Sequence, residues 1–544
     1  MSNSNRSGHR DSFATDNLPP RESWPDLLLN RPEFAYPPRL NVVVELIDKA
    51  VAAGHGARPC VFAPGIAWSY ADFLDRVNRI ASVLVRKFGL VPGNRVLLRA
   101  ANNPMMLAAY FAVLKAGGVA VATMPLMRAG ELATVINKAQ VSLAVCDHRI
   151  VDELRQAREQ AAPLKAIVTF GGGTPDDLES LTAGTSPDFA AADTAQDDVC
   201  LIAFTSGTTG VPKGTMHFHR DLLAICDSYS RHLLQPRSDD RFIGSPPLAF
   251  TFGLGGLALF PLRAGASTVL LEKTTPQDLL DGIETFKATV IFTAPTAYRA
   301  MLAELPRHDI ASLRRCVSAG ETLPAPTFEV WRKATGLTIT EGIGSTEMLH
   351  IFIGCTPDSA RPGVTGQAVP GYEARIVDDE GRPVPDGTPG RLAVRGPTGC
   401  RYLADPRQKD YVQHGWNITG DVFVRDADGY FRFEARGDDM IISSGYNIAG
   451  PEVEAALLRH PAVADCGVVA APDEERGQIV KAYVVLAPGQ TPGPDLARAL
   501  QEHVKASIAP YKYPRQIEFV ADLPRTATGK VQRFVLRKRA KGEG

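Results

Sequence analysis

Apolar residues recur at two different spacings along the chain, and these spacings predict alternating helices and strands. Residues 70–89 carry apolar side chains at helical spacing, whereas residues 94–100 form a short apolar run typical of a strand. Residues 103–125 read as a helix followed by a second strand. Further strand candidates between helical segments are residues 141–147, 164–170, 266–272, 288–296 and 313–321. This rhythm predicts a large mixed or parallel sheet.

The pattern changes after Gly363. Residues 372–397 alternate like hairpin strands, with turns at Glu380-Gly381 and Asp386-Gly387. After Arg436 a fresh small α/β pattern begins. Its helix candidates are residues 451–461 and 495–508, and its strand candidates are residues 463–473 and 480–489. We expect an α/β protein with a large multi-subdomain N-terminal region of mixed βα sheets, a β-rich subdomain, and a small α+β C-terminal domain.

The domain boundaries follow from these changes of pattern. We expect a partly disordered lead-in over residues 1–40, a large N-terminal unit over residues 41–436, and a small C-terminal unit over residues 437–544. The last unit is about a hundred residues long, which is enough for independent folding.

Charge and composition narrow the class of protein. The 59 basic and 60 acidic residues leave a net charge of −1, so there is no global attraction to nucleic acid or to an anionic membrane. Residues 243–262 are uncharged but contain three prolines and four glycines, which predicts a buried wall rather than a membrane span. The eight cysteines form no CxxC pair, which is typical of reduced thiols and predicts a cytoplasmic protein.

The sharpest local signal is the run Thr205–Gly214, which directly follows the apolar residues 198–204. Its small residues let backbone N–H groups approach an anion, its hydroxyls donate hydrogen bonds, and Lys213 adds a positive charge. Pro212 and Gly214 stand where a Walker A loop requires other residues, so a P-loop NTPase fold is not expected. The run indicates a triphosphate site, with an ordinary surface turn as the alternative.

Four further motifs follow this loop in order: EGIGSTE at 341–347, GWNITGD at 415–421, RGDDMIISSGYNIAGPEVE at 436–454 and PRTATGKVQR at 524–533. With this set the chain resembles the adenylate-forming enzymes from about Asn41 to its last residue. That family comprises acyl-CoA synthetases, peptide-synthetase adenylation domains and luciferases. The stretches GIGSTEMLHIF and SAGETLP, with Phe250 in place of a common histidine, look most like benzoate-CoA and 2-aminobenzoate-CoA ligases.

The resemblance implies that the chain binds ATP, Mg²⁺ and CoA. Glu347 would ligate Mg²⁺, which prefers hard oxygen donors, and Thr346 would reach the α-phosphate. Asp421 would accept hydrogen bonds from both ribose hydroxyls, and Arg436 would brace the sugar. The implied cofactor-binding residues are Thr205, Ser206, Gly207, Thr208, Thr209, Gly210, Lys213, Ala319, Gly320, Glu321, Glu341, Gly342, Ile343, Thr346, Asp421, Arg436 and Gly445.

Catalysis and acyl binding are implied in the same way. Lys530 would bridge the carboxylate and the α-phosphate while the adenylate forms. The implied catalytic residues are Lys530, Thr346, Glu347 and Lys213. The implied aryl-binding residues are Phe250, Thr251, Phe252, Gly253, Gly344, His350 and Ile351. A lone histidine in an apolar stretch is also common in a core, so the role of His350 stays open.

The resemblance implies that residues 41–436 form an AMP- and acyl-binding domain and that residues 437–544 form a mobile catalytic domain. This one C-terminal domain would serve two steps, because Lys530 and CoA would approach the same carbonyl in turn. In relatives the residue two places after the ribose-binding arginine is the hinge, which is Asp438 here. Residues 443–446, with Gly445, would then line the pantetheine tunnel.

These features predict an AMP-forming acid-thiol ligase that converts a benzoate-type or 2-aminobenzoate-type acid to aryl-AMP and then to aryl-CoA. Three alternatives stay open: an adenylation enzyme that loads an aryl acid onto a carrier protein, a medium-chain acyl-CoA synthetase, and a nucleotide-binding protein without catalysis. The expected partners are the aromatic acid, ATP and CoA, without nucleic acid or membrane. The preferred acid, the pathway and homodimer formation are left open by the sequence.

Overall fold

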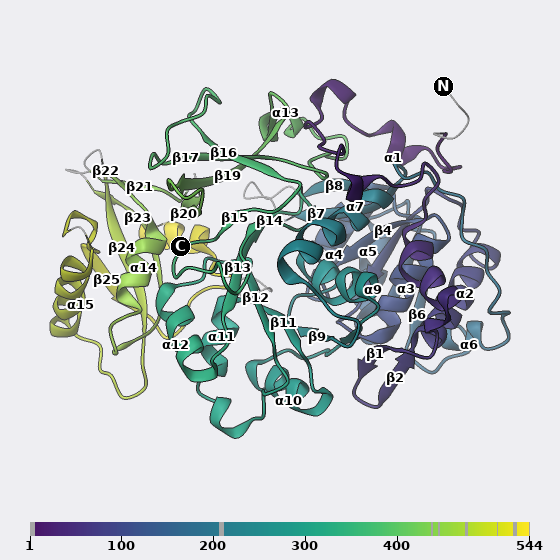
Figure 1. The fold of residues 1–544 in the computed structure, drawn as a ribbon, viewed down its shortest axis with the longest axis horizontal. Helices are drawn as coiled ribbons and strands as arrows, with labels where there is room; N and C mark the ends of the chain where they lie inside the picture. The colour runs from purple at the N-terminus through teal and green to yellow at the C-terminus, as the bar shows by residue number, and fades with distance from the viewer. Residues whose placement is uncertain are drawn as a thin grey trace.

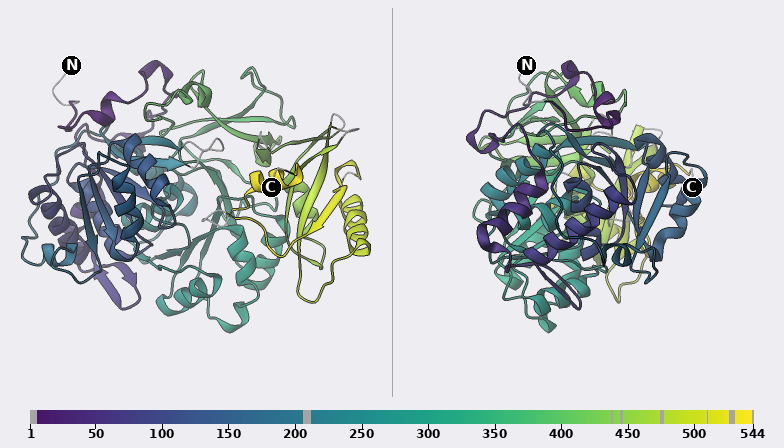
Figure 2. Two further views of the ribbon diagram at one scale, coloured as in Figure 1. Left: turned by 180° about the vertical axis from the view of Figure 1, so that it is seen from behind. Right: turned by 90° about the vertical axis from the view of Figure 1, so that its right-hand side faces the viewer.

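The computed structural model describes residues 6–205, 212–436, 439–443, 446–473, 477–508, 510–525 and 530–542. Its sheets are spread along the long axis of the molecule (Figures 1 and 2). A six-stranded sheet lies at one end, a nine-stranded sheet in the middle, and the C-terminal segment at the other end. The α/β class with a small C-terminal domain is confirmed, although the large sheet expected from the sequence is divided into two.

The six-stranded sheet has the order β6-β5-β3-β4-β7-β8, and all its neighbours are parallel except β7 and β8. Helix α3 covers one face with α2 behind it, while α4 and α5 cover the other face. Successive residues of β3 and β4 therefore face two different apolar layers, as buried parallel strands do. The strands are β3 (Arg95–Arg99), β4 (Val119–Thr123), β5 (Leu143–Asp147), β6 (Ala166–Phe170), β7 (Val199–Thr205) and β8 (Lys213–Phe218). The helices are α2 (Tyr70–Arg86), α3 (Pro104–Lys115), α4 (Ala129–Ala139), α5 (Val151–Glu159) and the short α6 (Leu178–Thr182).

The nine-stranded sheet has the order β15-β14-β13-β12-β11-β9-β10-β1-β2. Its strands from β13 to β1 are parallel to their neighbours, and antiparallel strands close both edges. The strands are β1 (Pro59–Ala63), β2 (Ile66–Ser69), β9 (Arg241–Gly244), β10 (Ser267–Val269), β11 (Val290–Thr293), β12 (Arg315–Ala319), β13 (Ile339–Gly344), β14 (Ile351–Gly354) and β15 (Gln367–Ala368). Helices α10 (Pro276–Phe286), α11 (Pro295–Met301) and α12 (Ala325–Thr335) pack on this sheet.

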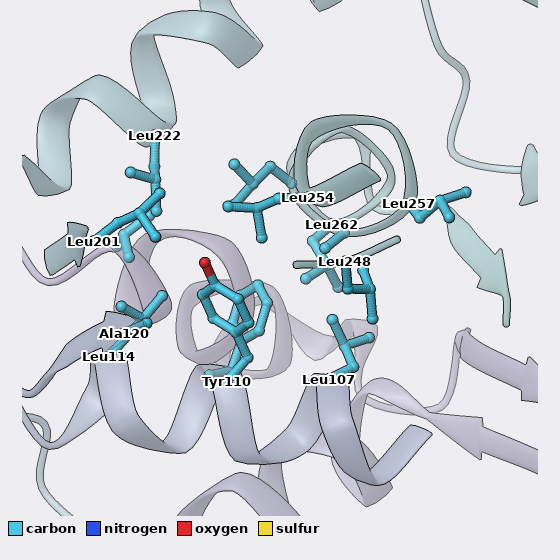
Figure 3. Close-up of a cluster of buried hydrophobic side chains, with 14 of the residues drawn as sticks. Leu107, Tyr110, Leu114, Ala120, Leu201, Leu222, Leu248, Leu254, Leu257 and Leu262 are labelled. Atoms are coloured by element: carbon cyan, nitrogen blue, oxygen red, sulfur yellow. The ribbon is translucent and has the colours of Figure 1, made fainter. Parts of the chain in front are cut away.

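The uncharged residues 243–262 form an internal wall between the two large sheets. They include α8 (Thr251–Leu254), a π-helical turn at Gly255–Leu259 and the start of α9 (Phe260–Ala264), and most of their side chains are buried. Figure 3 shows Leu254 and Leu262 on the side of this segment that faces Leu107 and Tyr110 of α3. Within the described residues, no helix is both long and apolar enough to span a bilayer.

A five-stranded antiparallel sheet follows, and it differs from the sequence prediction in one respect. Strands β16 (Glu373–Val377) and β17 (Gly390–Arg395) form one hairpin, with both predicted turns inside its single connection. Pro383 and Pro385 interrupt that connection, and proline cannot donate to a strand ladder, so residue 383 forms only an isolated bridge to Val377. The remaining elements are α13 (Gln408–Tyr411), β18 (Val412–Gln413), β19 (Trp416–Arg425) and β20 (Phe431–Arg436).

The C-terminal segment has a hydrophobic core of its own, built from residues 441–519. Strands β23, β24 and β25 form its sheet, with β21 and β22 as a separate pair. The predicted helices and strands of this segment are all present. They are β21 (Ile441–Ser443), β22 (Tyr446–Ile448), α14 (Gly450–Leu457), β23 (Val463–Asp473), β24 (Gly477–Leu486), α15 (Pro494–Ser507), β25 (Gln516–Phe519) and α16 (Arg533–Ala540).

Residues 6–40, expected as a partly disordered lead-in, join the six-stranded sheet to the five-stranded sheet. Ser7 Oγ and Gly8 N donate hydrogen bonds of 2.6 and 2.8 Å to the Asp198 carboxylate, and α1 (Phe13–Asp16) lies nearby. Farther on, Leu27 forms a parallel bridge with Gly396 of the five-stranded sheet. Buried acidic partners such as Asp198, which is 2% exposed, explain why a polar segment is held here. Residues 1–5 lie outside the described part.

Candidate active site

The predicted phosphate loop connects two paired strands. Thr205, the last residue of β7, lies opposite Lys213, the first residue of β8, in the antiparallel register. The loop between them therefore starts and returns at one point on the sheet edge. Its predicted cofactor-binding residues Ser206, Gly207, Thr208, Thr209 and Gly210 lie outside the described residues, so their role stays a prediction.

Lys213 lies beside the predicted metal ligand Glu347, and a tyrosine connects them. Lys213 Nζ donates to the Tyr402 hydroxyl at 2.8 Å, and that hydroxyl donates to Glu347 Oε1 at 2.5 Å. The direct distance from Lys213 Nζ to Glu347 Oε1 is 3.5 Å. Glu347 and Tyr402 are 7% and 1% exposed, so this group is largely withdrawn from water. It brings together a cation, a carboxylate and a phenol.

Thr346 lies in a constrained turn between β13 and β14. Its carbonyl accepts hydrogen bonds from His217 Nε2 at 2.8 Å and from Leu349 N at 3.2 Å. Leu349 has φ of 71°, a left-handed conformation that a leucine adopts only when its surroundings impose it. The turn that presents Thr346 and Glu347 is thus fixed by contacts from other elements.

A buried ion pair supports His217. The Arg401 guanidinium donates to the carboxylate of Asp221, which lies in α7 (His219–Ile225), and both side chains are fully buried. Asp221 also accepts a hydrogen bond from Phe218 N at 3.0 Å and lies 3.7 Å from His217 Nδ1. Burial alone would raise the pKa of Asp221. The Arg401 charge opposes this effect, and the pKa is lowered to about 2. The pair therefore stays charged inside the fold.

The two segments predicted to hold adenine lie side by side. Ala319 of β12 pairs with Gly342 of β13, so the predicted residues around them meet at the ends of parallel strands. Gly320 follows β12 with φ of 93°, which turns the chain toward Glu321. The Glu341 carboxylate accepts a hydrogen bond from Leu323 N at 2.9 Å, and burial raises its pKa to about 7. Ile343 follows in β13 and is half-buried.

The two predicted ribose residues are direct neighbours. Asp421 of β19 and Arg436 of β20 lie opposite each other in the antiparallel register. Asp421 is 8% exposed, and its backbone N–H is bonded to Thr419 Oγ1 at 3.3 Å. The five-stranded sheet therefore presents both residues at one place.

Of the predicted aryl-binding residues, Phe252 lies against the ring of His350. Phe250 is the residue before α8, and Thr251, Phe252 and Gly253 form its start. The Phe252 and His350 rings lie 5.6 Å apart, and Phe260 packs edge-on against His350 at 4.6 Å. Neither ring nitrogen of His350 has a hydrogen-bond partner among the described residues, and burial lowers its pKa to about 3. A neutral imidazole is thus held among aromatic rings.

Gly344 and Ile351 complete this group. A Cβ atom on Gly344 would lie 2.6 Å from the His350 carbonyl oxygen, so only glycine fits there without a shift of the backbone. Gly344 and Ile351 are paired across β13 and β14.

Lys530 comes from the C-terminal segment and lies against the predicted adenine segment. A Cβ atom on Gly320 would lie 3.3 Å from Lys530 Cε and 3.9 Å from its Nζ. Arg525 Nη1 lies 3.9 Å from Glu321 Oε1, and Arg299 Nη2 donates to Val463 O at 3.1 Å. The predicted hinge Asp438 and the predicted Gly445 lie outside the described residues.

Sequence reasoning did not identify Tyr402 or the Arg401–Asp221 pair. Tyr402 stands in no motif used above, and a tyrosine after an arginine carries no signal by itself. Asp221 could have been noticed as the third residue of α7, where it accepts from the Phe218 backbone as an N-terminal capping residue.

Comparisons with known proteins show the family of the chain. The model of the AMP-binding enzyme family matches residues 48–402, and that of the AMP-binding enzyme C-terminal domain matches residues 452–530. The chain belongs to the AMP-binding enzyme family. The chain is 36% identical to the benzoate–CoA ligase of Thauera aromatica, across 93% of this chain and 97% of that protein.

Solved structures of family members are similar over nearly the whole chain. An anthranilate CoA ligase in complex with anthranoyl-AMP has a TM-score of 0.90 at 34% identity, with 94% of this chain and 99% of that chain covered. A benzoate CoA ligase from Burkholderia xenovorans has a TM-score of 0.84 at 31% identity, with 92% and 100% covered. Members named as CoA ligases thus share both sequence and fold with this enzyme.

Proposed function

We propose that this AMP-binding enzyme joins an aromatic carboxylic acid to CoA through an acyl-adenylate. Two contacts carry the proposal: Lys213 lies beside Glu347, and Lys530 lies against the Gly320 segment. The turn that holds Glu347 continues into His350. Its similarity to proteins named benzoate–CoA ligase and anthranilate CoA ligase supports the aromatic substrate class.

The first step forms the adenylate. A carboxylate oxygen attacks the α-phosphorus of ATP, the bond from that phosphorus to the β-phosphate oxygen breaks, and pyrophosphate leaves. Little covalent chemistry is required of the protein, so positioning and charge neutralisation supply the rate. Lys213, Thr346 and the loop at 205–214 hold the phosphates, Asp421 and Arg436 hold the ribose, and Lys530 binds the reacting oxygens.

The donor set near Lys213 suits Mg²⁺. Mg²⁺ is commonly held by one or two carboxylates together with substrate phosphates. Glu347 is such a carboxylate, and no group of three or more His, Cys, Asp or Glu side chains able to hold a metal occurs within the described ranges. Glu347 would hold Mg²⁺ that arrives with ATP, and the ion would neutralise phosphate charge.

The second step forms the thioester. The CoA sulfur attacks the acyl carbonyl, the bond to AMP breaks, AMP leaves, and the thiol proton passes to solvent. For this step we propose that the C-terminal domain, residues 437–544, rotates about Asp438 and brings Gly445 toward the pantetheine arm.

His350 favours an aryl acid with a hydrogen-bonding substituent as a second candidate substrate. Its neutral ring offers one donor and one acceptor, and both nitrogens lack a partner among the described residues. A 2-aminobenzoate could satisfy them, whereas benzoate would leave them unpaired.

The described cysteines are all buried and free, which supports a cytoplasmic location.

CoA-dependent AMP release over a panel of acids tests the proposal. Benzoate and 2-aminobenzoate should give AMP and aryl-CoA, whereas a medium-chain fatty acid should give less. AMP release with acid and ATP that needs a carrier protein instead of CoA would favour the loading enzyme. No AMP with any acid would favour a nucleotide-binding protein without catalysis.

A further inference from the structure

Tyr402 stands between the two charged residues of the triphosphate site. Its hydroxyl contacts Lys213 Nζ at 2.8 Å and Glu347 Oε1 at 2.5 Å, and its ring lies 4.8 Å from Lys213 Nζ. Neither the family motifs used above nor the proposed reaction assigns a role to this residue.

The direction of both hydrogen bonds is determined by chemistry. A lysine ammonium only donates and a carboxylate only accepts, so the phenol must accept from Lys213 and donate to Glu347. Both hydrogen bonds have a charged partner, and hydrogen bonds of this kind are stronger than those between two neutral groups.

The backbone of Tyr402 is held from three sides. It forms an isolated antiparallel bridge with Thr215 of β8, two residues after Lys213 in the chain. Its N–H donates to Gln408 Oε1 at 2.9 Å, and Gln408 Nε2 donates to Ser23 O at 2.9 Å in the N-terminal segment. Leu403 N donates to Gly214 O at 2.8 Å. The phenol is thus placed by the fold and not by its own two polar contacts.

We propose that Tyr402 is a positioning residue for magnesium nucleotide, which keeps Lys213 and Glu347 from closing into a direct hydrogen-bonded ion pair. Their 3.5 Å separation is longer than the roughly 2.7–2.9 Å of a charge-assisted hydrogen bond. Without the phenol, the ammonium and the carboxylate would neutralise each other and would be less available to phosphate and metal. This inference rests on the nucleotide part of the proposed function.

Tyr402→Phe tests this role because phenylalanine fills the same buried volume without the hydroxyl. Isothermal titration with MgATP, without acid or CoA, should show affinity about tenfold weaker, and the Mg²⁺ concentration for half-maximal activity should rise. The KM for the aryl acid at saturating MgATP should change less than about twofold. The fitted stoichiometry reports the folded fraction, so partial unfolding cannot imitate weaker binding.

Tyr411→Phe is the matched control. Its ring packs edge-on against Tyr402 at 5.8 Å, but its hydroxyl lies 3.3 Å from Ser345 Oγ and, within the described residues, is hydrogen-bonded to neither Lys213 nor Glu347. It should bind MgATP within about threefold of wild type. Equal losses in both variants, or unchanged MgATP affinity and Mg²⁺ dependence in Tyr402→Phe, would overturn the proposal.

A double-mutant cycle with Lys213→Met distinguishes an effect that acts through Lys213 from a general loss of stability. If Tyr402 acts by separating Lys213 from Glu347, Tyr402→Phe should weaken MgATP binding less than about twofold on the Lys213→Met background. A full tenfold effect there would contradict the inference. Because only MgATP binding is measured, a failed acid panel would refute the aryl-CoA proposal and leave this result standing.

Discussion

The residues proposed to hold the nucleotide and the lysine proposed to act on it are placed in different ways. Glu347 lies in a turn tied to Lys213, Tyr402 and His217 by hydrogen bonds of 2.5 to 2.8 Å among buried groups. Lys530 belongs to a segment with its own core, and the polar contacts around it include a 3.9 Å approach of Arg525 to Glu321.

Because of this difference, nucleotide binding and the catalytic lysine belong to separate regions of the molecule. A site fixed by packed sheets can hold a nucleotide through both steps, whereas a lysine delivered on a separately folded segment can act in one step and leave in the next. The two regions should therefore respond differently to substitution: changes in the first should alter stability or binding, and changes in the second should alter one rate.

Asp221→Asn should have the largest effect, because it leaves the buried Arg401 charge without its partner. We expect a loss of about 3–5 kcal/mol in the free energy of unfolding, measured by denaturation followed through tryptophan fluorescence. Asp75→Asn removes the half-exposed pair with Arg79 and should cost less than about 1 kcal/mol.

The effect of Asp221→Asn on the free energy of unfolding should depend on pH. The pKa of Asp221 is lowered from 3.8 to about 2, so its ionised form stabilises the fold above pH 3.8 and this contribution is lost as pH falls through 2. The difference between wild type and Asp221→Asn should be constant at neutral pH and shrink at the acid end. A deficit as small as that of the Asp75 control would show that this region is not held by its buried pair.

Lys530→Ala should lower the rate of adenylate formation by about 10² or more, the usual scale for a positioned electrostatic donor. Acid-dependent pyrophosphate release measures this step. Conversion of supplied aryl-adenylate and CoA to aryl-CoA should be nearly unchanged, because the lysine binds charge that develops only in the first step. Equal losses in both half-reactions would contradict the division between the two regions.

Gly344→Ala should raise the KM for aryl acids about tenfold with little change for ATP. The new Cβ would press on the His350 carbonyl at 2.6 Å, and overpacking of this kind costs about 1–3 kcal/mol. Gly130→Ala is the control, since its Cβ meets no atom within 4 Å. Impaired ATP binding with an unchanged aryl KM would move Gly344 from the acyl site to the nucleotide site.

Arg525→Ala should have the smallest effect. Arg525 pairs with Asp465 of its own segment and lies 3.9 Å from Glu321. A partly exposed ion pair is worth about 0.2–1 kcal/mol, so loss of these contacts should slow pyrophosphate release up to about fivefold. Thioester formation from supplied adenylate should not change. Arg498, which pairs only with Asp495 of its own helix among the ion pairs of the described residues, provides the control variant Arg498→Ala. Indistinguishable rates in the two variants would remove Arg525 from the docking contacts.

Local pattern predicted β3 to β7 of the six-stranded sheet and β23 and β24 of the C-terminal segment, because short buried runs such as residues 141–147 have one favourable structure. It did not predict β8, β21, β22 or β25. It did not predict the division into two sheets, since the order of strands depends on contacts between distant residues. The motifs predicted Lys213 and Glu347. They could not predict Tyr402, whose position depends on a bridge to Thr215 across the fold.

The central claim, that a carboxylate is activated at the α-phosphate of ATP, is tested most directly by oxygen transfer. Benzoate labelled with ¹⁸O in both carboxylate oxygens is incubated with the enzyme, ATP, Mg²⁺ and CoA. The ¹⁸O content of each product is then measured by mass spectrometry. The account predicts one ¹⁸O in AMP, one in benzoyl-CoA and none in pyrophosphate. Label in inorganic phosphate together with ADP would contradict it, because the attack would then have occurred at the γ-phosphate.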